Sequence, residues 1–329
     1  MGMECESVSK IFAINDKAAF ADEAYKIFTF QFAHNPVYEQ WCKLLFTDAQ
    51  NTLLPHQIPF LPISFFKSHK IASTNFDEAA IFESSGTLQT INSKHFVKDI
   101  DLYKTSFIKA FQLFYGDIKD WCIIGLLPSY LERNGSSLIM MVDELIKMSN
   151  HAISGFYLDN HEKLHATLQM LEAKQQKTLL IGVTFGLLDF TEKFSMQLQH
   201  TVIMETGGMK GRRKEMTRAE VHEILKQKLG VEVVHSEYGM TELLSQAYSL
   251  GNGKFMCPPW MKVLVRDEED PLVVKENGRG VLNIIDLANA YSCSFIATED
   301  VGIVYDDGSF EVHGRLDNSD IRGCSLLVI

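Results

Sequence analysis

The middle of the chain alternates between short, unbroken apolar runs and longer stretches in which apolar residues recur every three or four positions. Unbroken runs of about four to eight residues are typical of strands that are covered on both faces. Runs of this kind span residues 79–85, 121–127, 178–185, 201–206 and 231–236. We therefore expect a series of buried strands in this part of the chain.

The stretches between these runs have helical periodicity. In residues 93–116 apolar side chains follow at three- and four-residue steps, with Ser93 as the expected N-cap and Gly116 as the expected end. Residues 136–148 have the same spacing, and residues 217–230 open with a capping box and close on a glycine. Strands that alternate with helices of crossover length predict an α/β fold with a doubly wound, mainly parallel sheet.

The pattern changes after about residue 250, where short β-like runs separated by Gly and Asp replace the helices. This pattern of short runs predicts a β-rich, antiparallel subdomain. We expect one large domain over residues 1–313, with the doubly wound core at about 79–250 and the β-rich part at about 251–313. Residues 314–329 would form a hinge-like segment and a C-terminal tail.

Composition and charge exclude several classes of protein. The 31 Lys and Arg residues against 42 Asp and Glu residues give a net charge of −11, which argues against a nucleic-acid binder. The first residues lack the charged start and apolar run of a signal peptide, and no apolar run reaches the roughly 18 residues of a membrane span. The six cysteines form no C-x-x-C pair. We expect a reduced, cytoplasmic protein.

One motif points to a metal. Residues 161–165 read HEKLH, and H-E-x-x-H on a helix can hold zinc with the Glu as general base. The expected helix buries Leu164 and Leu168, however, and at about 100° per residue Glu162 faces away from that apolar side. Because no obvious third ligand follows, we expect a solvated helix face here and not a metalloprotease site.

Two polar turns follow expected core strands. FESSGTLQT (82–90) reads as a strand-to-helix turn that offers hydroxyl and N–H groups to an anion, although it lacks the Gly-Lys-Ser/Thr ending of a Walker loop. In HSEYGMTELL (235–244), Tyr238, Thr241 and Glu242 suit a base, a phosphate and Mg²⁺ at the carboxyl end of a parallel strand. A plain strand-to-helix loop and a strand followed by a capped helix are the alternatives.

Two further turns lie in the β-rich part. SFIATEDVG (294–302) places Asp300 where it can accept ribose hydroxyls, and the alternative is an ordinary hairpin turn. GRLD (314–317) opens the tail. Each turn is weak evidence by itself, and the order of all four carries more information.

In order, the four turns resemble those of the adenylate-forming enzymes, which include acyl-CoA synthetases, luciferases and peptide-synthetase adenylation domains. The chain is more similar still to the acyl-protein synthetase (LuxE-like) family of the bacterial bioluminescence fatty-acid reductase complex, and the likeness covers nearly its whole length. The segments that carry it are NPVYEQWC (35–42), IPFLPISFFKS (58–68), PSYLERNGSSLIMMVDELI (128–146), IGVTFGLLD (181–189), METGGMKGRRKEMTRAE (204–220), YGMTELLSQAY (238–248), ATEDVG (297–302) and GRLDNSDIRGCSLL (314–327).

The resemblance implies an ATP site. The residues that would bind the nucleotide are Ser84, Ser85, Gly86, Thr87, Gly207, Gly208, Tyr238, Gly239, Asp300 and Arg315. The Ser/Gly/Thr loop would bind the phosphates of ATP. Gly207 and Gly208 would line the adenine side of the nucleotide site. Tyr238 would flank the base, Asp300 would take the ribose hydroxyls, and Arg315 would contact the nucleotide near the hinge. As catalytic residues, Thr241 would bind the adenylate phosphate and Glu242 would hold Mg²⁺.

The chain departs from the wider superfamily at two places. The phosphate loop normally ends in a lysine, whereas this chain continues LQTINSK, so Lys210, Arg212 or Arg213 would have to substitute. A typical acyl-CoA synthetase also continues past Gly-Arg-x-Asp into a lid domain of roughly 100 residues. The present sequence runs only twelve residues past Asp317.

The tail holds a cysteine where the acyl-protein synthetases have their acyl acceptor. The resemblance implies that Cys324 is acylated, and Arg322 would favour its thiolate. The segment from Asp317 to Cys324 spans up to roughly 23–25 Å when it is extended, which is enough to carry a thioester toward a partner. The competing interpretation is a packed cysteine in a final strand.

The expected function is therefore ATP-dependent activation of a carboxylic acid, fatty by resemblance, with ATP and Mg²⁺ as cofactors. The acyl group would pass through Cys324 to a partner protein, either an acyl-CoA-reductase-like enzyme or a carrier protein. Direct transfer to coenzyme A or a carrier-protein thiol is the alternative. A non-enzymatic adenylate-binding or scaffold protein is a third possibility, because the phosphate-loop lysine is missing.

Overall fold

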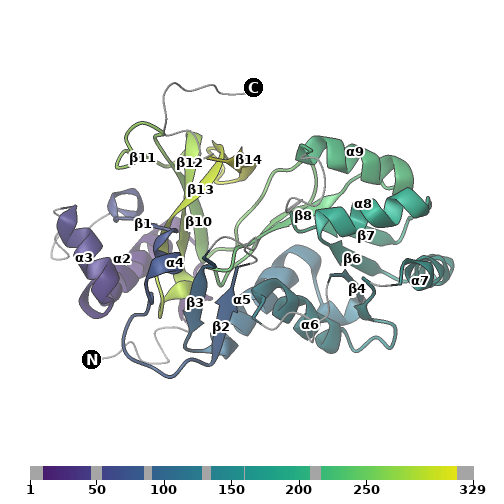
Figure 1. Ribbon diagram of the computed structural model, residues 1–329, viewed down its shortest axis with the longest axis horizontal. Coiled ribbons are helices and arrows are strands. Elements are labelled where there is room, and N and C mark those ends of the chain that lie inside the picture. Colours follow the sequence, from purple (N-terminus) through teal and green to yellow (C-terminus); the bar gives the residue numbers. More distant parts are fainter. Residues whose placement is uncertain are drawn as a thin grey trace.

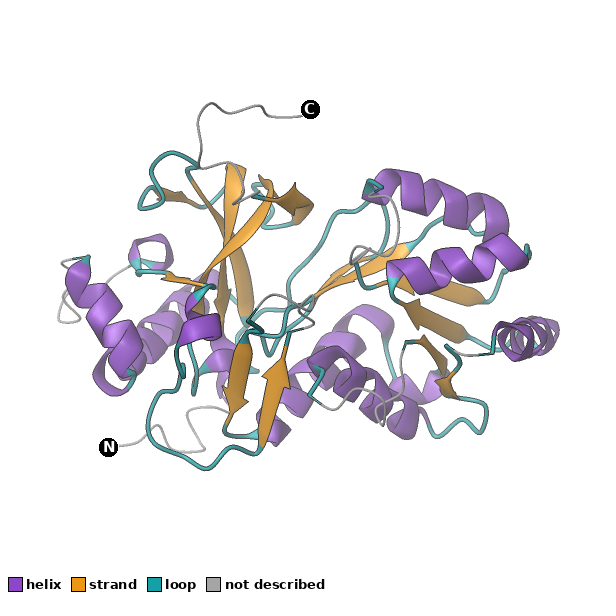
Figure 2. Ribbon diagram, viewed as in Figure 1, coloured by secondary structure: helices purple, strands orange, loops and turns teal. Residues whose placement is uncertain are grey.

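The computed structural model describes residues 10–45, 54–84, 91–127, 135–158, 160–207 and 216–316. These residues form two six-stranded sheets and one two-stranded hairpin, with helices packed around them (Figures 1 and 2). The two large sheets stand side by side, and the hairpin lies near the middle of the molecule (Figure 1).

The first large sheet is the α/β core. Its strands are β4 (Cys122–Leu126), β5 (Gly155–Phe156), β6 (Thr178–Gly182), β7 (Thr201–Glu205), β8 (His235–Tyr238) and β9 (Ala247–Ser249). They lie in the order β5-β4-β6-β7-β8-β9, and every neighbouring pair is parallel except β8 with β9. The chain reverses its direction across the sheet at β4, as in a doubly wound sheet.

Helices cover both faces of this sheet because its strands are apolar on both sides. They are α5 (Ile100–Tyr115), α6 (Ser137–Ser149), α7 (His161–Ala173), α8 (Thr184–Lys193) and α9 (Arg218–Leu229). In β4, Ile123 packs in the same core cluster as residues of α5 and α6, whereas Ile124 packs in a second cluster with residues of α7, α8 and α9. Figure 1 shows α8 and α9 above the sheet and α5 and α6 below it. The expected mainly parallel α/β core is present, but the first apolar run, at residues 79–85, is not part of it, because residues 80–83 pair in the separate hairpin.

The second large sheet is made mostly by the last third of the chain. Its strands are β1 (Leu61–Pro62), β10 (Met261–Arg266), β11 (Val274–Lys275), β12 (Gly278–Asp286), β13 (Phe295–Val304) and β14 (Phe310–Arg315). They lie in the order β1-β13-β12-β10-β11, with β14 also paired to β13. All pairings are antiparallel except that of β1 with β13. This is the β-rich part that the sequence predicts.

The N-terminal segment packs against the second sheet. Its elements are α2 (Lys17–His34), α3 (Pro36–Leu44), the 3₁₀ turn η1 (Pro55–Gln57) and α4 (Phe65–Ser68). Phe28 of α2 and Tyr38 of α3 both contact the ring of Phe295 in β13. The buried Gln31 donates hydrogen bonds to the carbonyls of Asn289 and Ala290, so α2 also fixes the 3₁₀ turn η3 (Leu287–Asn289) that follows β12.

The expected helix over residues 93–116 is wrong in its first third. Residues Lys94–Val97 form β3, which pairs with β2 (Ala80–Glu83) in an antiparallel hairpin. The helix begins after Asp99, whose side chain accepts the N–H groups of Asp101 and Leu102. The Ser/Gly/Thr segment therefore connects two strands and does not lead into a helix. Gly116 does end the helix, at a φ of 80°.

Two other expected turns also differ. The turn expected at Asp300 is absent, because Asp300 lies within β13, which pairs with β12 and β14 and has register shifts to both close to this residue. After β8, no helix begins within residues 239–246, and the chain turns directly into β9.

The HEKLH segment opens α7, as expected, with Leu164 and Leu168 buried. The imidazole of His161 packs edge-on against Phe190, and that of His165 stacks on Phe194. Among the described residues no group of three or more His, Cys, Asp or Glu side chains can hold a metal ion. Within the same residues, every helix is too short or too polar to cross a membrane.

Candidate functional site

The candidate site lies where the carboxyl ends of β7 and β8 meet the second sheet. Tyr238 is the last residue of β8, Asp300 lies in the middle of β13, and Arg315 ends β14. Asp300 and Arg315 are directly opposite each other in the antiparallel pair. The folding of the two sheets therefore brings together three residues that are expected to bind nucleotide and are up to 77 positions apart (315 − 238).

Hydrogen bonds connect these three side chains. The hydroxyl of Tyr238 donates to Oδ2 of Asp300 at 2.7 Å, and Nε of Arg315 donates to Oδ1 at 3.0 Å. Asp300 is 5% exposed, while the Arg315 side chain is 71% exposed. Burial and the nearby Asp300 carboxylate raise the pKa of Tyr238 well above its usual value, so the phenol keeps its proton and remains a donor. The exposed Arg315 guanidinium leaves further N–H groups for a ligand.

Thr241 and Glu242 lie in the turn between β8 and β9. The Glu242 side chain is buried, and this burial raises its pKa. The carbonyl oxygen of Thr241 accepts a hydrogen bond from Nδ1 of His95 at 2.9 Å, and the carbonyl of Glu242 accepts one from Nδ2 of Asn289 at 2.6 Å. The backbone of the expected catalytic pair is thus held from β3 on one side and from η3 on the other.

Asp286, the last residue of β12, fixes the rest of the same turn. Its carboxylate accepts the N–H groups of Leu244 and Ser245 at 2.7 and 3.0 Å and the Ser245 hydroxyl at 2.5 Å. Burial raises the pKa of Asp286 to about 6, although these donors act in the opposite direction. A buried acceptor with this many donors makes the turn after Glu242 rigid.

Gly207 lies at the end of β7, beside the buried Glu205. Oε2 of Glu205 accepts the N–H of Gly207 at 2.7 Å, and Oε1 accepts Nε of Arg218 at 3.0 Å. Burial alone would raise the pKa of Glu205, but His222, Arg218 and the Gly207 amide lower it to about 2. Arg218 also donates to the carbonyl of Val312 in β14 at 2.9 Å. The expected adenine-side turn is therefore tied to the second sheet.

Part of the expected site lies outside the described residues. Ser84 directly follows β2, and its hydroxyl accepts the N–H of Ser93 at 2.9 Å, so it closes the hairpin at the base of the expected phosphate loop. Gly239 packs so closely on the Glu237 carboxyl that a Cβ there would approach its Oε1 to 2.5 Å. The expected residues that fall outside the described ranges are Ser85, Gly86, Thr87, Gly208, Lys210, Arg212, Arg213 and Cys324.

Sequence reasoning missed several residues that support the site. They are His95, Glu205, Arg218, Asp286 and Asn289. None of them stands in a recognisable spacing, because each contacts a segment that is distant in the chain. Asp286, Asn289 and Glu205 are buried polar residues, a property that only the folded structure reveals.

Comparison with known proteins gives a consistent result. No model of a protein family matches the chain. The protein has the fold of adenylate-forming ligases: 2-hydroxyisobutyryl-CoA ligase, solved in complex with 2-HIB-AMP, superimposes with a TM-score of 0.66 at 10% identity over 92% of this chain and 68% of that one. ATP-bound MatB from Rhodopseudomonas palustris gives a TM-score of 0.52 at 16% identity over 74% of this chain, and the match spans half of the length of MatB.

In sequence, the chain is a distant relative of the long-chain-fatty-acid–luciferin-component ligase of Aliivibrio fischeri. The two are 22% identical over 326 residues, which cover 91% of this chain and 85% of that protein. The likeness thus extends over nearly the whole chain, as the motifs predict.

Proposed function

We propose that this protein activates a carboxylic acid with ATP to form an acyl-adenylate. In this reaction a carboxylate oxygen attacks the α-phosphorus of ATP, a new P–O bond forms, and the bond to the β-phosphate breaks to release pyrophosphate. The observation that carries the proposal is the Tyr238–Asp300–Arg315 cluster. Three residues to which the family resemblance gives a nucleotide-binding role meet at one end of β8, in a fold shared with ligases solved with ATP or an acyl-adenylate.

The side chains fit a nucleotide in a specific way. Asp300 has both oxygens engaged by Tyr238 and Arg315, and a carboxylate has about four lone-pair sites, so each oxygen can still accept one ribose hydroxyl. The exposed guanidinium of Arg315 lies at the solvent side of this cluster, where it can donate to an oxygen of the nucleotide. Tyr238 is held in place by Phe255 and Phe310, whose rings pack against it.

Glu242 is the acidic ligand that we assign to Mg²⁺. Mg²⁺ is usually bound through one or two carboxylates together with substrate phosphates and water, and a single buried carboxylate whose pKa is raised by burial gains from a neighbouring cation. Mg²⁺ would neutralise the phosphates that repel the attacking carboxylate. The Thr241–Glu242 turn is held in place before substrate binds, because His95 and Asn289 bind its two carbonyls. Asp286 fixes the residues that follow it by accepting the N–H groups of Leu244 and Ser245.

For the second step we propose transfer of the acyl group to the thiol of Cys324. The thiolate attacks the acyl carbonyl, a thioester forms, and AMP leaves with the electron pair of the broken C–O bond. The described cysteines are poorer nucleophiles: burial raises the pKa of the Cys42 thiol to about 12, and it raises the pKa of Cys122, Cys257 and Cys293 as well. Onward transfer to a reductase-like enzyme or a carrier protein completes the proposal, with a fatty acid as substrate by similarity to the Aliivibrio ligase.

The alternative second step is direct transfer from the adenylate to coenzyme A or a carrier-protein thiol. It is favoured by the similarity of the fold to two CoA-ligase-type structures. The two mechanisms differ in whether the protein itself becomes acylated.

Incubation with ATP, Mg²⁺ and a labelled fatty acid tests the proposal. We expect label that survives denaturation, is released by hydroxylamine and is lost in Cys324→Ala. Cys257→Ala is the matched control and should keep the label. Label that persists in Cys324→Ala contradicts the role of this cysteine, and full turnover of that variant with added coenzyme A favours the alternative.

A further inference from the structure

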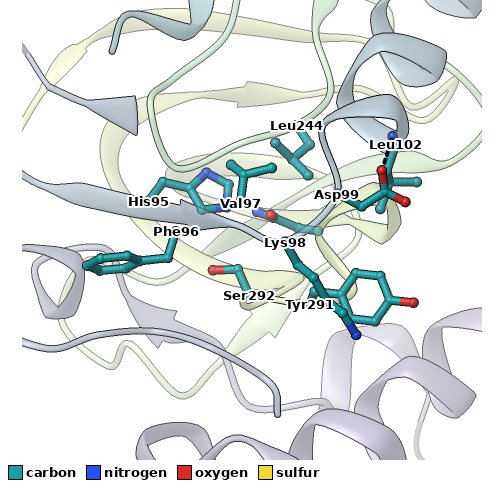
Figure 3. A pocket seen from close by; sticks show the side chains of 10 residues that line it. His95, Phe96, Val97, Lys98, Asp99, Leu102, Leu244, Tyr291 and Ser292 are labelled. Atoms are coloured by element: carbon teal, nitrogen blue, oxygen red, sulfur yellow. Dashed lines mark hydrogen bonds between the residues drawn. The ribbon is translucent and has the colours of Figure 1, made fainter. Parts of the chain in front are cut away.

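A small cavity lies between β3 of the hairpin and the segment at η3. Figure 3 shows that it is lined by His95 and Val97 of β3, by Leu244, and by Tyr291 and Ser292 from the segment after η3. The cavity leaves about 10 Å³ for the centre of a water molecule, which is roughly the room that one water needs.

The imidazole of His95 is one of the side chains that line this cavity. The ring is 1% exposed, and burial lowers its pKa to about 4, so it is neutral at pH 7. The Thr241 carbonyl can only accept, and therefore Nδ1, which lies 2.9 Å from it, carries the one ring hydrogen. Nε2 is then a bare acceptor and has no donor among the described residues. The Asn289 side chain lies close enough to raise the pKa of the ring slightly, but its Nδ2 is committed to the carbonyl of Glu242.

Asn289 also lines the cavity. Its side chain is fully buried, and Nδ2 donates to the carbonyl of Glu242 at 2.6 Å. Because that carbonyl only accepts, the amide cannot be turned around, and Oδ1 has to point the other way. Oδ1 is also buried without a partner among the described residues. Two acceptors thus remain unsatisfied, each on a side chain that binds the backbone of the turn.

Two buried acceptors without donors destabilise the folded state. The other polar groups around the cavity are engaged elsewhere. The hydroxyl of Ser292 donates to the carbonyl of Ile71 at 3.1 Å, the ammonium of Lys98 lies 4.1 Å from the ring centre of Tyr291, and the carboxylate of Asp99 caps α5. A small ligand with two hydrogens to donate satisfies both acceptors.

We propose that a single bound water donates one of its hydrogens to Nε2 of His95 and its second hydrogen to Oδ1 of Asn289. The two side chains and this water then position the Thr241–Glu242 turn. The water site is a property of the protein alone and does not depend on the proposed function. The positioning role rests on the proposed function, since it makes His95 and Asn289 positioning residues for the adenylate-forming reaction.

The water itself is tested without any activity. A crystal structure of the full chain should show a water oxygen within about 3.2 Å of both atoms, and ¹⁵N NMR at pH 7 should show His95 neutral with hydrogen on Nδ1. A dry cavity, the Lys98 ammonium in this place, or hydrogen on Nε2 that bonds Asn289 directly would overturn the water site. Lys98→Met should leave the water unchanged.

The positioning role is tested by two variants of His95. An Asn amide nitrogen takes the place of Nδ1, so His95→Asn keeps the donor to Thr241. A Gln amide takes the place of Nε2, so His95→Gln loses that donor. We expect His95→Gln to lower the kcat of acid-dependent ATP–pyrophosphate exchange about tenfold, as for loss of one hydrogen bond, with the KM for ATP nearly unchanged.

His95→Asn should restore most of this kcat. Equal kcat values for the two variants, or a loss confined to the KM, would overturn the positioning role. Absence of exchange in the wild type would instead contradict the proposed function, and the crystal structure and NMR measurements would still decide the water site.

Discussion

The hydroxyl of Tyr238, the last residue of β8 in the α/β sheet, donates a 2.7 Å hydrogen bond to Asp300 in β13 of the second sheet. Both side chains are at most 8% exposed, so the bond is shielded from water. It connects the two sheets at the point where the proposed nucleotide site lies. Changes to this pair therefore act on stability and on nucleotide binding together.

Tyr238→Phe removes the donor and keeps the ring. We expect the free energy of unfolding to fall by about 1.5–3 kcal/mol, the usual worth of a hydrogen bond to a charged group, and the KM for ATP to rise. Urea denaturation followed by circular dichroism measures the first effect. Tyr305→Phe, which removes a bond to Glu311 at the surface, is the control. An unchanged unfolding midpoint for Tyr238→Phe would contradict the account.

Glu242→Gln tests the proposed Mg²⁺ ligand. The variant keeps the backbone bond to Asn289 and nearly the same volume, so we expect the fold to remain as stable as the wild type. The rate of adenylate formation should fall by at least about 100-fold, comparable to loss of a preorganised electrostatic group, and the Mg²⁺ concentration for half-maximal rate should rise. Glu83→Gln, at the partly exposed end of β2, should change neither. A Glu242→Gln protein with wild-type Mg²⁺ dependence would exclude this role.

Arg218→Met breaks the ion pair with Glu205. Because Glu205 is 3% exposed, its carboxylate would lose its main cationic partner, and we expect a loss of about 3 kcal/mol in unfolding free energy. Glu205→Gln combined with Arg218→Met should recover part of that loss, because no buried charge then remains. If the double variant is as unstable as the sum of the two single variants, the pair does not interact as described.

Glu237 gives a pH prediction. Burial and the charge of Glu205 raise its pKa to about 8, above the usual 4.5, so the folded state binds more protons than the unfolded state between these values. Stability should therefore fall as pH rises from about 4.5 to 8, with a slope of up to about 1.4 kcal/mol per pH unit for one proton. We expect the wild type to lose stability relative to Glu237→Gln over this range, and a constant difference between the two would contradict the prediction.

His95 acts in the opposite direction over an overlapping pH range. Its pKa is lowered to about 4 from 6.5, so its contribution makes the protein more stable as pH rises between these values. Comparison of each variant with the wild type separates the two groups, whereas the total pH profile does not.

Local patterns of the sequence predict the α/β core well. The apolar runs correspond to β4, β6 and β7, and the capping box of Thr217 with Glu220 begins α9, which ends at Gly230. These features depend on neighbouring residues, which is why a sequence reveals them. The apolar spacing, which Phe96 continues, predicts that the helix also covers residues 93–99, but pairing of residues 94–97 with β2 outweighs this preference.

The site is predictable only in its motif residues. Tyr238, Asp300 and Arg315 stand in recognisable turns, and the structure brings them together. Nothing near Asp286 or Asn289 in the sequence indicates that they bind the turn after β8, about 40 residues earlier. Such contacts depend on how β12 crosses the second sheet, which is a property of the tertiary fold.

Acid-dependent ATP–pyrophosphate exchange tests the central claim most directly, because it reports adenylate formation without needing the final acyl acceptor. With Mg²⁺, labelled pyrophosphate and a series of carboxylic acids of increasing chain length, we predict label in ATP only when a suitable acid is present, and loss of the exchange in Asp300→Ala. If the wild-type protein is folded and binds ATP but none of the acids in the series supports exchange, the account is contradicted.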